Sequence, residues 1–184
     1  GWGQMLQKFC PPDVRVINLA VGGRSTRSFV AEKRWEKLLA QLSPGDLVLI
    51  QFGHNDQKKD SPERYAPADG SYQEYLKRFI ADVRERKGEV VLCTPVARRI
   101  FDGAKVRNTL GGYPEAVRKV GAETGTPVID LYNATVAALE KYGPEKSAEL
   151  FYVTPEQQPD RTHFNRAGAE LVAGEVARAL KEKQ

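Results

Sequence analysis

The sequence predicts an α/β fold built on a parallel β-sheet. Short apolar runs, LVLI within 47–53 and VVLC within 89–96, have the length and composition of buried strands. Between them, residues 71–87 carry apolar side chains at spacings of three and four, which is typical of a helix with one buried face. Strands that alternate with helices in this way form parallel sheets covered by helices, and functional groups gather at the carboxyl ends of such strands.

The remaining elements follow from the same two patterns. Residues 13–23, DVRVINLAVGG, read as a strand that ends in glycines, and residues 27–42 read as the helix after it, with an apolar face around Trp35. Residues 126–131, TPVIDL, read as the last strand. Helices are expected at 113–124, 133–142 and 166–182, and the DRTH segment is expected in the loop before the last of them.

Composition excludes several classes of protein. The chain has 184 residues, of which 41% are hydrophobic, and a mean hydropathy of −0.50, so we expect a soluble globular domain without a membrane partner. The net charge of +4 is spread over helix faces such as EKRWEK, and no nucleic-acid motif accompanies it, so no nucleic-acid partner is expected. The two cysteines lack metal-binding spacing, and we expect no metal and no cofactor.

The DRTH segment places Asp160 and His163 three residues apart before a helix. An aspartate at this distance can accept a hydrogen bond from one ring nitrogen, which leaves the other nitrogen free to act as a general base. The alternative is that Asp160 only caps a turn and His163 is merely exposed.

Two hydrogen-bond donors lie at other strand ends. Asn55 follows the strand 47–53, and Gly23 closes the strand 13–23. A side-chain amide and an unobstructed backbone N–H can together form an oxyanion hole. The alternatives are an amide that stabilises a turn and a glycine that permits a positive φ.

The blocks INLAVGGRSTRSF, QFGHND, TPVARR and DRTHFN, in this order, resemble those of the SGNH (GDSL-type) hydrolases, and most of all the rhamnogalacturonan acetylesterase group. The resemblance implies a three-layer α/β/α, flavodoxin-like fold with five parallel strands in the order 2-1-3-4-5. It implies Asp160 and His163 as triad members and Gly23 and Asn55 as oxyanion donors. It also implies a serine esterase that removes O-acetyl groups from pectic rhamnogalacturonan through an acyl-enzyme, and hence a role in pectin degradation.

One departure from the family pattern affects the catalytic assignment. The family nucleophile is the serine of a G-D-S motif, and no such motif occurs in the 184 residues. Ser25 and Ser28 belong to the GRSTRSF block and do not match that serine. We therefore expect residues 1–184 to be a single SGNH-type domain that is truncated at its N-terminus and lacks the family's first strand.

The expected partner is an acetylated oligo- or polysaccharide. Arg24, Arg98 and Arg99 lie near the ends of predicted strands, where guanidinium groups can meet the carboxylates of galacturonate. The sequence leaves open the choice between pectin, xylan and a small acetylated sugar, and it leaves open the oligomeric state. An extracellular location is slightly favoured over a cytoplasmic one.

Two other functions are compatible with the same residues. A carbohydrate-binding pseudoenzyme would retain the site without a nucleophile. A metal-dependent phosphoesterase would use His54, Asp56, Asp160 and His163 as ligands, although their order does not match the usual ligand blocks of that class.

Overall fold

The computed structural model describes residues 1–182, and these divide into two compact units. The first, here called the sheet unit, comprises Val21–Pro95 and Leu110–Asp130. The second, here called the hairpin unit, comprises Gly1–Ala20, Val96–Thr109 and the chain from Leu131 onwards.

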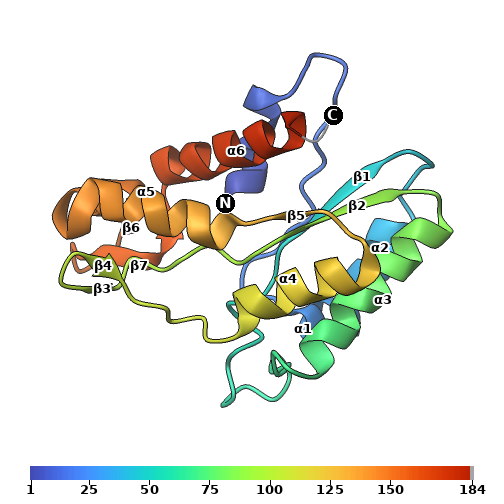
Figure 1. The fold of residues 1–184 in the computed structure, drawn as a ribbon, viewed down its shortest axis with the longest axis horizontal. Helices are drawn as coiled ribbons and strands as arrows, with labels where there is room; N and C mark the ends of the chain where they lie inside the picture. The colour runs from blue at the N-terminus through green and yellow to red at the C-terminus, as the bar shows by residue number, and fades with distance from the viewer. Residues whose placement is uncertain (183–184) are drawn as a thin grey trace. The chain divides into compact units, whose positions relative to one another are not determined.

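The sheet unit contains three parallel strands (Figure 1). They are β1 (Leu47–Ile50), β2 (Glu89–Cys93) and β5 (Val128–Ile129), in the order β1-β2-β5. Ile50 pairs with Leu92, and Leu92 pairs with Val128. The structure thus confirms the last three of the expected strands, in the order that the family resemblance implies.

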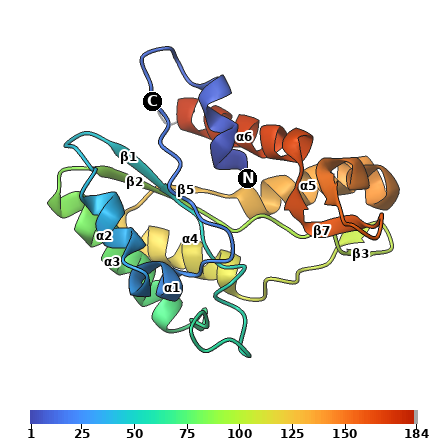
Figure 2. The same ribbon diagram turned by 180° about the vertical axis from the view of Figure 1, so that it is seen from behind.

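Four helices belong to the sheet unit: α1 (Thr26–Ala31), α2 (Arg34–Leu39), α3 (Ser71–Glu85) and α4 (Tyr113–Thr124). Figure 2 shows α1 and α2 beside α3, where the buried Trp35 ring lies 4.0 Å from the ring of Phe79, centroid to centroid. The single helix expected at 27–42 is wrong, because Lys33 has a φ of 57° and this left-handed residue separates α1 from α2.

The hairpin unit holds the N-terminal turns and the last third of the chain. Its longest helices are α5 (Leu131–Lys146), which is interrupted at Gly143 before Pro144, and α6 (Arg166–Lys181). The N-terminal turns lie along α6, where Lys8 forms an ion pair of 2.6 Å with Glu170 (Figure 1). The shorter elements are η1 (Trp2–Gln4), η2 (Leu6–Phe9), β3 (Phe101–Asp102), β4 (Lys105–Val106), η3 (Ser147–Leu150), β6 (Phe151–Val153) and β7 (Pro159–Phe164).

The strand expected at 13–23 is wrong. Residues 13–20 form neither helix nor strand, and residues 22–23 form a turn. The side chain of Gln7 bonds to the backbone of this segment, because its amide donates to the Val14 carbonyl at 2.8 Å and accepts from the Val16 N–H at 2.8 Å. A strand requires a backbone ladder, and among residues 1–182 this segment has none.

The α/β class is confirmed by a parallel sheet whose strands alternate with helices. The third layer of the α/β/α arrangement stays a prediction, as does the expectation of a single domain. Among residues 1–182, no helix combines the length and the apolar composition needed to cross a membrane.

Candidate active site

The loop after β1 is anchored by Asp56, whose side chain is completely buried. Its carboxylate accepts hydrogen bonds from the Thr26 N–H and hydroxyl, and from the Gly53 N–H at 2.9 Å. Gly53 has a φ of 132°, and a Cβ there would lie 3.1 Å from the side chain of Pro95, so the position requires glycine. Asp56 therefore joins the QFGHND loop to the start of α1, and it does so beside Asn55.

Burial raises the pKa of Asp56 to about 6. The hydrogen bonds from Thr26 and Gly53 act in the opposite direction, since they favour the carboxylate, and they offset only part of the effect of burial. The hydrogen bonds that join the QFGHND loop to α1 therefore depend on a carboxyl group, that of Asp56, whose pKa lies close to neutral pH.

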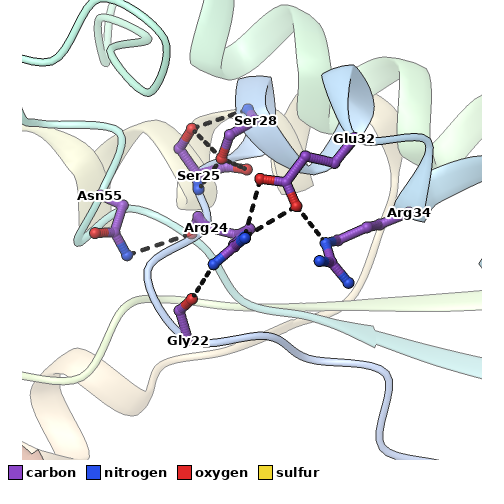
Figure 3. A network of polar contacts seen from close by, with 7 residues as sticks. All are labelled: Gly22, Arg24, Ser25, Ser28, Glu32, Arg34 and Asn55. Atoms are coloured by element: carbon purple, nitrogen blue, oxygen red, sulfur yellow. Dashed lines mark hydrogen bonds and ion pairs between the residues drawn. The ribbon is translucent and has the colours of Figure 1, made fainter.

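A second network holds the glycine turn that carries Gly23 (Figure 3). Arg24 donates through Nε to both carboxylate oxygens of Glu32 at 3.0 Å, and through Nη1 to the Gly22 carbonyl at 3.0 Å. Asn55 donates through Nδ2 to the Arg24 carbonyl at 3.3 Å. Gly23 itself has a φ of 78°, and its backbone is thereby held between α1 and the QFGHND loop.

The two candidate donors, Gly23 and Asn55, thus lie on segments that are hydrogen-bonded to each other. The Asn55 amide carries two hydrogens, and only one is needed for the bond to Arg24. The other hydrogen and the Gly23 N–H are the groups that an oxyanion would use.

Ser25 and Ser28 have a structural role at the start of α1. Both are buried, and they form a capping box in which Ser25 Oγ accepts from the Ser28 N–H at 3.1 Å and Ser28 Oγ accepts from the Ser25 N–H at 2.9 Å. Both hydroxyl groups are engaged in this capping box and also lie 3.2 Å from each other, so neither serine is placed as a nucleophile.

A hollow of about 220 Å³ lies next to this network. It is lined by Gly23, Arg24, Ser28, Glu32, Glu63 and Arg64. Its charged side chains pair with one another, Arg24 with Glu32 and Arg64 with Glu63.

In the hairpin unit, Asp160 and His163 lie on β7 rather than in a loop, and they contact each other directly. Asp160 Oδ2 is 3.0 Å from His163 Nδ1, and Oδ1 accepts from the N–H groups of Thr162 and His163. Partial burial opposes ionisation, but these hydrogen bonds outweigh it and lower the pKa of Asp160 to about 2. The ionised carboxylate fixes the imidazole, and 73% of the His163 side chain is exposed to solvent.

The structure gives the three predicted substrate-binding arginines contacts within the protein. Arg24 pairs with Glu32, Arg98 donates through Nη1 to the carbonyl and hydroxyl oxygens of Thr109, and Arg99 donates through Nη1 to the Pro144 carbonyl. Arg24 therefore holds the glycine turn, and a role in substrate binding stays a prediction for all three.

The sequence analysis missed residues that position these groups. Glu32 carries no motif signal, and its contact with Arg24 spans a helix. Asn165 caps α6 and donates to the carbonyls of Glu149 and Phe151, which ties β6 to the helix. Only its place directly after the DRTHF segment could have indicated a cap.

The metal-dependent alternative needs ligands that lie close together. Within the described part of the chain, no three His, Cys, Asp or Glu side chains come close enough to hold a metal ion. Asp56 is also unsuited as a ligand, because its carboxylate is buried and accepts from Thr26 and Gly53.

The comparisons with known proteins decide the family. Residues 1–171 match the model of the GDSL-like Lipase/Acylhydrolase family. The chain belongs to this family. It is 38% identical over 182 residues to a probable rhamnogalacturonan acetylesterase, YesY, of Bacillus subtilis (strain 168), with 99% of this chain and 83% of that protein covered. It is 40% identical over 191 residues to the rhamnogalacturonan acetylesterase RhgT of the same strain, with 99% and 81% covered.

Solved structures show the same fold. An X-ray structure of a Bacillus subtilis protein matches with a TM-score of 0.88 at 28% identity, and it covers 100% of this chain and 50% of that one. The chain thus spans half the length of that protein. An α/β hydrolase from the metagenome of Lake Arreo, Spain, matches with a TM-score of 0.77 at 24% identity, covers 98% of this chain and 81% of that one, and supports the fold alone.

Proposed function

We propose that this GDSL-family hydrolase is a carbohydrate acetylesterase that removes O-acetyl groups from rhamnogalacturonan. The observation that carries the proposal is the likeness, over nearly the whole chain, to two proteins named as rhamnogalacturonan acetylesterases. The sequence blocks that resemble the family also support it, because they contain Gly23, Asn55, Asp160 and His163.

In the proposed reaction, His163 accepts the proton of a serine hydroxyl while the serine oxygen bonds to the acetyl carbonyl carbon. Asp160 holds the imidazole through Nδ1 and stabilises the imidazolium that forms. The Gly23 N–H and the Asn55 amide stabilise the negative charge on the carbonyl oxygen. His163 then returns the proton to the sugar oxygen as the ester bond breaks, and a water molecule releases acetate from the serine by the same two steps.

The serine itself is the group that these residues do not supply. The sequence contains no G-D-S motif, and Ser25 and Ser28 are buried in the capping box of α1. The proposed route therefore needs a serine from beyond the 184 residues, and we propose that the full-length protein provides it.

The test is acetate release by the full-length protein from acetylated rhamnogalacturonan and from acetylated xylan, with and without EDTA. We expect release from rhamnogalacturonan, a lower rate on xylan, and no effect of EDTA. Absence of acetate from both substrates would refute the proposal, and loss of activity with EDTA would favour the metal-dependent alternative.

A further inference from the structure

The hairpin that carries Asp160 and His163 contains an unusually large bulge. Phe151 pairs with Phe164 and Val153 pairs with Pro159, so that one residue of β6 faces four residues of β7. The one residue is Tyr152, and the four are 160–163. A bulge of this kind redirects side chains, and bulges occur frequently next to active sites.

Tyr152 presents an aromatic ring to solvent across from the candidate base. Its exposed fraction is 57%, whereas the neighbouring Phe151 is buried and packs against Phe164 with ring centroids 4.5 Å apart. Phe151 therefore supports the hairpin from inside, and Tyr152 remains available on the outside. An exposed aromatic ring beside a catalytic group is a suitable platform for the apolar face of a sugar.

Two positive charges accompany this ring. Arg161 is an exposed residue of the bulge, and the Arg99 N–H donates to its carbonyl at 2.8 Å. Burial and, after it, the charge of Arg161 lower the pKa of Arg99, as expected for two guanidinium groups in close proximity. Within residues 1–182, neither arginine forms an ion pair with a carboxylate.

The carboxylate nearest in sequence does not neutralise them. Asp160 precedes Arg161, but its two oxygens accept from Thr162 and His163. Arg99 has Nη1 on the Pro144 carbonyl, and its guanidinium lies over the Phe151 ring at 5.9 Å. Two guanidinium groups, those of Arg99 and Arg161, therefore accompany one carboxylate, that of Asp160, and Arg161 is an exposed residue.

From this arrangement we propose that Tyr152 and Arg161 form a subsite for a uronate residue of the acetylated saccharide. The sugar ring lies against Tyr152, and the Arg161 guanidinium binds the uronate carboxylate, which its planar fork suits. Arg99 adds to the positive field from its half-buried position. The subsite rests on the proposed function, and it makes Tyr152 and Arg161 specificity-determining residues for that reaction.

The test compares two substrates that differ in one charge: an acetylated oligosaccharide with free uronate carboxylates and the same oligosaccharide with these groups methyl-esterified. In the full-length protein, Arg161→Gln should lower kcat/KM for the charged substrate about tenfold, mainly through KM, and change it less than about twofold for the neutral one. Tyr152→Ala should lower kcat/KM for both substrates, because both present the same ring.

The matched control is Arg178→Gln. Arg178 is an arginine of α6 in the same unit, and it pairs with Glu175 and Glu182. Its replacement removes the same charge from the unit, and we expect the ratio of the two kcat/KM values to stay unchanged. An equal effect of Arg161→Gln and Arg178→Gln on this ratio would overturn the subsite while the esterase function stands.

A binding measurement separates failure of the subsite from failure of the function. Calorimetric titration with the deacetylated uronide requires no turnover, and Arg161→Gln should raise its Kd about tenfold relative to wild type and to Arg178→Gln. Unchanged Kd would overturn the subsite. Weakened binding by Arg161→Gln in a protein that releases no acetate would support the subsite and refute the esterase function.

Discussion

Replacement of Asp56 by asparagine tests how the QFGHND loop is held. The variant keeps the shape of the side chain but exchanges one carboxylate oxygen for an NH2 group. Asn Oδ1 can still accept from Thr26, whereas Nδ2 then faces the Gly53 N–H, donor against donor. Two buried polar groups lose their partners at about 1–3 kcal/mol each, so we expect the free energy of unfolding at pH 7 to fall by about 2–6 kcal/mol.

The loss of stability caused by Asp56→Asn should depend on pH, because an aspartate side chain titrates and an asparagine side chain does not. The folded-state pKa of Asp56, about 6, lies above its ordinary value of 3.8, so the folded protein binds the proton more tightly than the unfolded chain does. Protonation of Asp56 therefore contributes stability that is fully present below the unfolded pKa and is lost as the pH rises through 6. Between pH 7 and pH 4 this contribution amounts to about 2 kcal/mol, and Asp56→Asn should be destabilising by that much more at pH 4.

The assay is chemical denaturation of wild type and variant at both pH values, with the free energy of unfolding extrapolated to zero denaturant. Asp60→Asn is the matched control, since Asp60 is exposed in the same loop and should change stability by less than about 0.5 kcal/mol. An Asp56→Asn variant that loses the same stability at pH 4 and pH 7 would refute the raised pKa. A variant as stable as the Asp60 control would refute the structural role of the carboxylate.

Two further variants test how other parts of the site are held. Glu32→Gln should lower kcat about tenfold and leave KM within about twofold, because it weakens the Arg24–Glu32 ion pair that holds the glycine turn. The control is Glu63→Gln at a residue that lines the same hollow, and it should change neither constant. Equal effects of the two variants would contradict this role of the ion pair. Gly168→Ala should destabilise the protein by at least about 2 kcal/mol in thermal or chemical unfolding, since a Cβ there would meet the Leu150 carbonyl oxygen and the Phe164 ring. The control is Gly174→Ala on the same helix, where the added Cβ would meet only the Phe9 ring at 3.7 Å and the free energy of unfolding should rise by up to about 1 kcal/mol. A similar change in stability at both positions would contradict the close packing of α6 around Gly168.

Most helices and three of the strands could be predicted from the sequence because they depend on local patterns, whereas the order of the strands followed from the family resemblance. The three- and four-residue spacing of apolar side chains in α3 directly reports its buried face. The segment 13–23 also has an apolar pattern, but a strand needs a neighbouring strand as well, and within residues 1–182 none pairs with this segment. The β6–β7 bulge was not predictable for a related reason, since register depends on pairing between distant residues.

In the candidate site, too, some contacts could be predicted from the sequence and others could not. The contact between Asp160 and His163 follows from their spacing in the sequence, and the structure confirms it. The sequence near Arg24 and near Tyr152 predicts neither the ion pair of Arg24 with Glu32 nor the position of Tyr152 opposite the bulge. Each depends on how the chain folds back on itself. Sequence reasoning could therefore name the chemical groups but not the residues that position them.

The proposed function depends most on His163 acting as the general base of a carbohydrate acetylesterase. The most direct test of this role is the rate of acetate release from acetylated rhamnogalacturonan by the full-length protein and by its His163→Ala variant. We expect acetate release by the wild type and a rate about 10²- to 10⁴-fold lower for the variant at unchanged stability. A variant that releases acetate as fast as the wild type, or a wild type that releases none, would contradict it.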